Sequence, residues 1–168
     1  SSIAVDTMLS VSDGSPLQVR DIITAVEQAN KAILSSAARH PEQTGMGTTL
    51  AGLAIVQMGG TEHWAVFNIG DSRVYRYLDE TLTQVTVDHS EVWEMVAEGR
   101  ITSEQARTHP GRNIITRSLG REPMGAVDTW VFPPYPGERF IVCSDGLSDE
   151  LSMAAIEQIL RDHSDPQE

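Results

Sequence analysis

Apolar side chains recur every three or four residues in two stretches near the amino terminus, a spacing typical of helices that pack along one face. Residues 1–9 follow this pattern with no capping residue before them. We therefore expect that they are the later part of a helix, in a natural protein that begins upstream. Ser15-Pro16 supplies a serine N-cap and a proline for the first turn, and His40-Pro41 supplies a stop signal. The sequence therefore predicts a long amphipathic helix between these two signals.

Between residues 51 and 87 the pattern changes to short runs of apolar, aromatic and β-branched residues, which are typical of strands. Gly59-Gly60 separates the first two runs and predicts a hairpin. The segment from Gly70 to Arg73 interrupts the pattern again, so Asp71 is predicted to lie in a hairpin turn of an antiparallel meander. The expected strands are residues 51–58, 63–69, 74–77 and 83–87.

The stretch from residue 88 to residue 120 is an insertion between strands, and insertions of this length are usually functional. It is predicted to contain a short helix that includes Val92 and ends at Gly99, and a second helix that begins with a capping box at Thr102. The elements expected after it are a strand at 127–132, a buried strand at 140–143 and an amphipathic helix from Leu151 to Leu160.

Asp145 follows the predicted buried strand almost directly and precedes Gly146. A carboxylate at the end of a strand is held rigidly, and a cation or a phosphate can approach the backbone closely beside glycine. The ordinary alternative is that Asp145 only caps the following turn, and the same alternative applies to Asp71. Ser12-Asp13-Gly14 repeats the tripeptide around Asp145, but no strand precedes it, so we interpret it as a loop.

The composition is that of one globular domain with an excess of acidic residues. The 168 residues are 40% hydrophobic, and 24 Asp and Glu against 12 Lys and Arg give a net charge of -12. Such a surface repels nucleic acid and anionic lipid, so we expect contact with neither. Cys143 is the single cysteine, and no apolar run has transmembrane length and no signal peptide pattern occurs at residues 1–10. These features favour a cytoplasmic protein without disulfides.

A series of short motifs occurs along the chain in a fixed order. They are Gly45-Met46-Gly47-Thr48-Thr49-Leu50, Asn68-Ile69-Gly70-Asp71-Ser72-Arg73-Val74-Tyr75, Asp88-His89-Ser90, Gly99-Arg100-Ile101-Thr102, His109-Pro110, Arg112-Asn113-Ile114-Ile115-Thr116-Arg117-Ser118-Leu119-Gly120 and Ser144-Asp145-Gly146-Leu147. Each motif is weak alone, but their order and spacing resemble the bacterial form of the metal-dependent Ser/Thr protein phosphatases of the PP2C family. The resemblance extends over nearly the whole chain.

The resemblance implies an α+β fold, a PP2C-like αββα sandwich of antiparallel sheets flanked by helices. Residues 1–168 would form a single, partial phosphatase domain with a flap insertion at about 88–120. Asp145 would be a catalytic ligand of a binuclear Mn²⁺ or Mg²⁺ centre, and Asp71 would help to hold a third metal ion. In the flap, Arg112 and Arg117 could bind the phosphate of the substrate or could simply balance surface acid.

The resemblance is incomplete at both ends of the chain, because the family's Asp-Gly-x-Gly-Gly motif and its late Asp-Asn strand are not present. The active site within this chain is therefore expected to be incomplete. Our leading hypothesis is an enzyme that removes phosphate from serine and threonine of phosphorylated proteins with a metal-activated water, opposing a Ser/Thr kinase by acting on it or its substrates. The alternative is a catalytically inactive PP2C-like module that regulates a partner or binds a phosphoprotein. A stress-response phosphatase is disfavoured by the flap.

Overall fold

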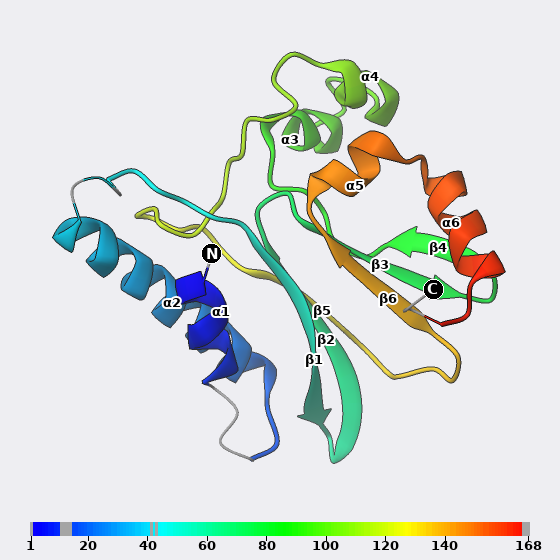
Figure 1. Ribbon diagram of the computed structural model, residues 1–168, viewed down its shortest axis with the longest axis horizontal. Helices are drawn as coiled ribbons and strands as arrows, with labels where there is room; N and C mark the ends of the chain where they lie inside the picture. Colours follow the sequence, from blue (N-terminus) through cyan, green and yellow to red (C-terminus); the bar gives the residue numbers. More distant parts are fainter. Residues whose placement is uncertain (1, 11–14, 41, 43, 166–168) are drawn as a thin grey trace.

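The part of the chain that the structure describes forms two three-stranded antiparallel sheets, each covered by helices on its outer face (Figure 1). The computed structural model describes residues 2–10, 15–40, 42 and 44–165. The predicted loop at Ser12-Asp13-Gly14 and Pro41 of the predicted helix stop lie outside the described residues. The order of layers, helices then sheet then sheet then helices, confirms the predicted α+β sandwich.

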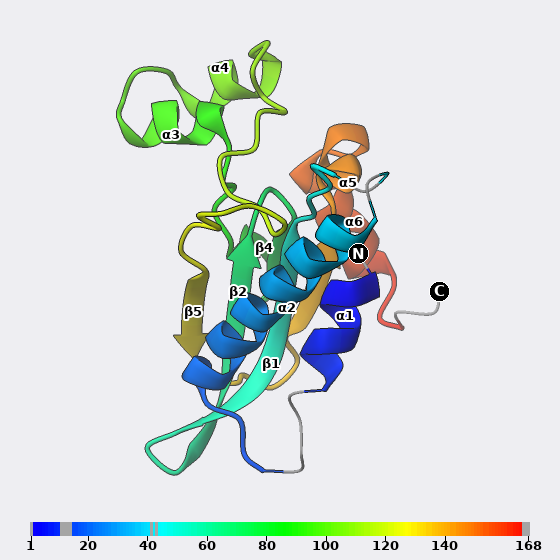
Figure 2. The same cartoon turned by 90° about the vertical axis from the view of Figure 1, so that its left-hand side faces the viewer.

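The first sheet has the order β1-β2-β5 and is covered by α1 and α2. Figure 2 shows the long helix α2 lying across this sheet. Both helices and the β1–β2 hairpin were expected from the sequence. The elements are α1 (Ser2–Leu9), α2 (Val19–Arg39), β1 (Leu50–Met58), β2 (Thr61–Ile69) and β5 (Asp128–Phe132).

The second sheet has the order β4-β3-β6, and the carboxyl-terminal helices pack on it. Its core joins Tyr75 and Tyr77 of the central strand to Ile156 of the last helix. The elements are β3 (Arg73–Leu78), β4 (Thr81–Gln84), β6 (Arg139–Cys143), α5 (Asp145–Glu150) and α6 (Met153–Asp162).

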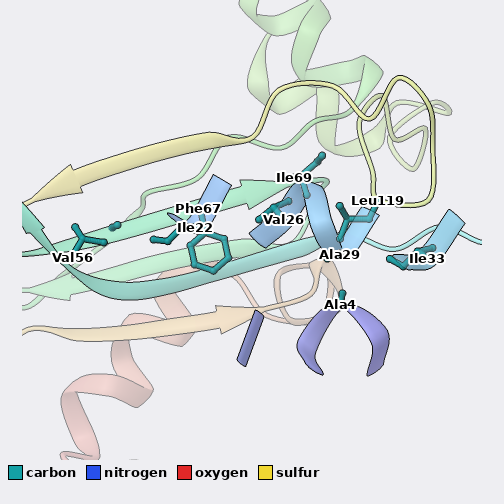
Figure 3. Packing of buried hydrophobic residues seen from close by; sticks show 10 residues of the cluster. Ala4, Ile22, Val26, Ala29, Ile33, Val56, Phe67, Ile69 and Leu119 are labelled. Carbon is teal, nitrogen blue, oxygen red and sulfur yellow. The ribbon is translucent and has the colours of Figure 1, made fainter. Parts of the chain in front are cut away.

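One stripe of α2 forms the centre of the first core (Figure 3). Val26 and Ala29 of the helix are completely buried, in one cluster with Phe67 and Ile69 of β2. Each buried Val, Ile or Phe side chain stabilises the fold by about 1.5–3 kcal/mol. The stripe therefore holds the long helix on the sheet and defines one outer layer of the sandwich.

Aromatic rings join the two sheets. Trp64 of β2 meets Phe140 of β6 edge to face, with ring centroids 5.3 Å apart, and the Arg76 guanidinium lies 4.8 Å from the Phe132 ring. The buried Glu138 carboxylate accepts hydrogen bonds from the Trp64 indole at 2.6 Å and from Arg76 Nε at 2.7 Å. The polar edges of these groups are thus satisfied where the sheets meet.

The predicted meander is wrong, although its strands exist. β2 pairs with β1 and β5, whereas β3 pairs with β4 and β6. The chain passes from one sheet to the other at Gly70, whose positive φ of 116° permits the change of direction. Asp71 therefore lies in a crossing between sheets, not in a hairpin turn.

Several predicted boundaries differ from the structure. The long helix begins at Val19 instead of Pro16, because Leu17 is held against β1 by the hydrogen bond from Gln57 N–H to its carbonyl, and Gln18 and Asp21 form the capping box. The fourth strand covers Thr81–Gln84 instead of residues 83–87, beside the positive-φ turn before it.

The region around Asp145 also differs from expectation. Asp145 begins the short helix α5, with Ser144 in the N-cap position, and so does not lie in a glycine turn. The last helix starts at Met153 because Leu151 is extended and the Ser152 hydroxyl caps the next helix. Strand β6 is only partly buried, and Val142 is 46% exposed, because β6 is an edge strand.

Two short helices stand beyond the end of the sandwich (Figures 1 and 2). They are α3 (Glu91–Ala97) and α4 (Ser103–Thr108), and the predicted capping box at Thr102 is present. We call residues 88–120 the flap segment.

Among the described residues, no helix is both long and apolar enough to cross a membrane.

Candidate metal and phosphate site

The sequence motifs converge at one end of the sandwich. Thr48 forms an antiparallel bridge with Leu119, through two backbone hydrogen bonds of 3.1 and 2.9 Å. The Asn30 side chain of α2 accepts a hydrogen bond from Gly120 N–H at 2.6 Å and donates one to the Arg121 carbonyl at 3.1 Å. Segments far apart in sequence are thereby fastened together beside the crossing at Gly70.

Gly70 is required by the packing of two of these motifs. A Cβ at this position would lie 2.2 Å from Cγ2 of Thr49, and the backbone φ of 116° is one that other residues rarely adopt. The Thr49 hydroxyl is in turn 2.8 Å from that of Ser72. The first motif therefore packs directly on the crossing that carries Asp71.

A cavity of about 430 Å³ lies between the flap segment and α5. Asp71 from the crossing, Asp145 from the start of α5 and Arg112 from the flap segment all line it. Asp71 and Asp145 are both partly buried, and Arg112 is exposed. The fold thus brings two predicted metal ligands and one predicted phosphate-binding residue to one cavity.

The cavity holds an excess of negative charge near Asp71. Burial raises the pKa of the Asp71 carboxyl above its ordinary value of 3.8, and the charge of Asp145 raises it further. Asp88 adds a smaller effect in the same direction, whereas Arg73 lowers the pKa. A cation close to Asp71 and Asp145 would relieve this repulsion.

Arg73 and Asp88 form a buried ion pair at the base of the cavity. Arg73 Nε lies 3.0 Å from each carboxylate oxygen of Asp88, whose side chain is 3% exposed. Burial lowers the pKa of Arg73, but the hydrogen bonds and the charge of Asp88, together with smaller effects of Tyr75, outweigh burial and raise the pKa above its ordinary value. Arg73 also donates to the Ser148 hydroxyl, which donates to the Asp145 carbonyl at 2.8 Å. This chain of contacts connects β3 to the helix that carries Asp145.

Arg117, the other predicted phosphate-binding residue, lies at the base of the flap segment. Its guanidinium forms an ion pair with Asp128 at 3.1 Å, and both side chains are about one-third exposed. The sequence left open whether each arginine binds phosphate or balances acid, and this ion pair supports the second interpretation for Arg117.

Sequence reasoning did not assign site roles to Arg73, Asp88 or Ser148, which the structure places around the cavity. Arg73 and Asp88 belong to two of the short motifs that occur in a fixed order along the chain, so those motifs were a usable signal. Ser148 lies one helical turn beyond Asp145, and nothing in the local pattern distinguishes it from other serines. The pairing of these residues depends on contacts between distant segments.

The described residues include two carboxylates of the kind that bind divalent metal ions. Carboxylate oxygens are suitable ligands for Mg²⁺ and Mn²⁺, and Asp71 and Asp145 present two such groups to one cavity. No cluster of three or more His, Cys, Asp or Glu suited to a metal ion occurs in residues 2–10, 15–40, 42 and 44–165. The two aspartates therefore fit as members of a ligand set that needs further donors.

Two antiparallel sheets between helical layers place this chain in the class of αββα sandwich folds, and its similarity to known proteins identifies the family. A family model described as protein phosphatase 2C matches residues 1–166. This chain belongs to the protein phosphatase 2C family.

Individual relatives agree with this assignment. The serine/threonine phosphatase stp of Listeria innocua is 37% identical over 136 residues, which are 81% of this chain and 52% of that protein. The Ser-Thr phosphatase MsPP of Mycobacterium smegmatis, solved in complex with cacodylate, has a TM-score of 0.85 and 35% identity, over 99% of this chain and 69% of that one. The catalytic domain of PstP, solved with two manganese ions, has a TM-score of 0.76 and 34% identity, over 95% and 66%. The chain thus spans about half the length of the Listeria relative.

Proposed function

We propose that this chain forms part of a metal-dependent phosphatase that removes phosphate from phosphoserine and phosphothreonine in proteins. The observation that carries the proposal is that Asp71, Asp145 and Arg112 line one cavity although they lie in three separate segments. Family membership and the manganese ions in the PstP structure support it. The proposed setting is the cytoplasm, with a Ser/Thr kinase or its substrates as partners.

In this proposal Asp71 and Asp145 hold Mn²⁺ or Mg²⁺ together with ligands from outside the described residues. When bound, such ions lower the pKa of a coordinated water and offset charge on the transferred phosphoryl group. The ion pair with Asp88 fixes the Arg73 guanidinium, which also donates to Ser148 of α5. These contacts hold α5 against β3, so that the Asp145 carboxylate remains directed at the cavity. Arg112 is exposed on the flap side and can donate two parallel hydrogen bonds to a phosphate.

The test is Mn²⁺-dependent hydrolysis of p-nitrophenyl phosphate and of a phosphothreonine peptide by the complete gene product that contains this chain. We expect activity that a chelator abolishes and that Asp145→Asn reduces by at least about a hundredfold. Asp79→Asn is the matched control, because Asp79 follows the far end of β3 and its φ of 50° is one that asparagine tolerates. A folded protein that shows no turnover when metal is supplied would refute the proposal of a phosphatase. That result would favour the inactive phosphoprotein-binding module.

A separate experiment tests the role of Arg112. Replacement by lysine keeps the charge but loses the planar fork, so we expect a higher KM for the phosphopeptide and a smaller change in kcat. Arg107→Lys is a matched control at a second exposed arginine that lines the same cavity. An unchanged KM for Arg112→Lys would remove Arg112 from the proposed site.

A further inference from the structure

His89 lies where the crossing and the flap segment meet, and its side chain is 3% exposed. Its backbone N–H donates to the Gly70 carbonyl at 2.9 Å. In return, Gly70 N–H donates to Nδ1 of the His89 ring at 3.0 Å. One residue therefore holds both polar backbone groups of the residue immediately before Asp71.

The bond from Gly70 fixes the tautomer of the ring. A backbone N–H can only donate, so Nδ1 of His89 is the acceptor and Nε2 of the neutral ring carries the hydrogen. That hydrogen is donated to Oδ2 of Asp128 at 3.0 Å. Oδ1 of the same carboxylate accepts from Arg117 at 3.1 Å. Asp128 thus orients the His89 ring, and Arg117 balances the negative charge of Asp128.

His89 also closes the base of the flap segment. Its carbonyl accepts a hydrogen bond from Thr116 N–H at 2.9 Å, and its neighbour Ser90 forms an antiparallel bridge with Ile115. Glu91 N–H donates to the Ile114 carbonyl at 2.9 Å. The two ends of the flap segment are therefore joined at the residue that holds the turn before Asp71.

We propose that His89, oriented by Asp128, is a positioning residue for Asp71. It fixes the Gly70–Asp71 backbone relative to the base of the flap segment, so that the Asp71 carboxylate and the flap face the cavity in one arrangement. The proposal rests on the proposed function, in which Asp71 is a metal ligand. A buried histidine with no such role would also be fully bonded, but its bonds would not converge on the peptide before a ligand.

The experiment separates the two sides of the His89 ring. Asparagine places a carbonyl oxygen near the position of Nδ1 and retains an acceptor for Gly70, whereas glutamine extends toward Asp128 and loses that acceptor. His109→Asn is the matched control, since His109 Nδ1 accepts the same kind of bond from Gly111 N–H at 3.1 Å within the flap segment. Each variant is first shown to be folded by its urea unfolding transition.

The first readout is amide hydrogen exchange at Gly70, followed by NMR in the 168-residue chain. Loss of one buried hydrogen bond corresponds to an exchange rate that rises about tenfold, which we expect for His89→Gln. His89→Asn should recover most of the protection, and His109→Asn should leave Gly70 unchanged. Recovery by asparagine distinguishes positioning of this peptide from general destabilisation. If His89→Gln does not fold, Asp128→Asn serves instead and should accelerate exchange at Gly70 by a smaller factor.

The second readout is Mn²⁺ binding by the complete gene product that contains this chain, measured by paramagnetic broadening of signals near Asp71 and Asp145. Groups that orient a metal ligand typically change affinity by about tenfold or more, so we expect His89→Gln to weaken binding about tenfold. Gly70 protection and Mn²⁺ affinity within twofold of the original chain in folded His89→Gln would overturn the proposal. If the complete gene product shows no broadening at either aspartate, the metal assignment of the proposed function fails, and the exchange experiment still decides whether His89 fixes this turn.

Discussion

Replacement of Arg73 by methionine would leave the Asp88 carboxylate buried without its charged partner. Removing one member of a buried ion pair costs about 3–5 kcal/mol, because the remaining charge is desolvated and unpaired. The Arg73 side chain is 18% exposed, and Gln84 also donates to Asp88 at 3.1 Å, so we expect the lower end of this range, about 3 kcal/mol. Since single domains are stable by about 5–15 kcal/mol, this is a large share of the total.

The measurement is the free energy of unfolding in urea, where a loss of about 3 kcal/mol lowers the midpoint by roughly 1.5 M for a typical dependence on denaturant. Arg20→Met is the control, because the Arg20 side chain is 77% exposed and its contact with Asp21 is 3.8 Å long. The double variant Arg73→Met with Asp88→Leu should be more stable than Arg73→Met alone, since it removes the unpaired charge. A loss below about 1 kcal/mol for Arg73→Met, or additive effects in the double variant, would refute the reasoning.

Two further substitutions test how the end of the sandwich is fastened. Gly70→Ala should cost more than about 3 kcal/mol, because its Cβ would overlap Thr49 at 2.2 Å, whereas Gly60→Ala, with φ of 85° and nothing within 4 Å, should cost about 1 kcal/mol. Equal losses in urea unfolding would contradict this. Asn30→Ala should cost about 2 kcal/mol, because it leaves Gly120 N–H without its acceptor, and faster hydrogen exchange at that amide is the direct check.

The helices and strands could largely be predicted because their signals are local. Apolar periodicity identified α2, and short runs of apolar and β-compatible residues identified β1 and β2 within a few residues of their observed limits. The start of α2 was missed because the bond from Gln57 to the Leu17 carbonyl holds that segment extended, and this contact joins residues far apart in sequence.

The division into two sheets could not be predicted from local patterns. Gly70-Asp71 has the composition of a hairpin turn, and only the pairing of β2 with β5 and of β3 with β6 reveals that the chain changes sheets there. These partners are supplied by later parts of the sequence. The turn residues therefore predicted correctly that the chain changes direction at Gly70-Asp71. The prediction that the strands on either side pair with each other was wrong.

The candidate site was predictable to the extent that motifs carried it. The motif order led to Asp71, Asp145 and Arg112, which the structure places around one cavity. It did not reveal that Arg73 pairs with Asp88, or that Arg117 pairs with Asp128, since charge partners on different strands depend on register. Asp128 is the first residue of an otherwise ordinary strand, and no local signal marked its carboxylate.

The hydrogen bond between Asn30 and Gly120 joins positions 90 residues apart, and it has a consequence for synthesis. A ribosome releases α2 and the β1–β2 hairpin early, and both can form from neighbouring residues. The loops that surround the cavity close only after the chain has passed Gly120 and then Asp145, at a greater cost in chain entropy. A nascent chain can therefore contain a folded hairpin and helix before its cavity has formed.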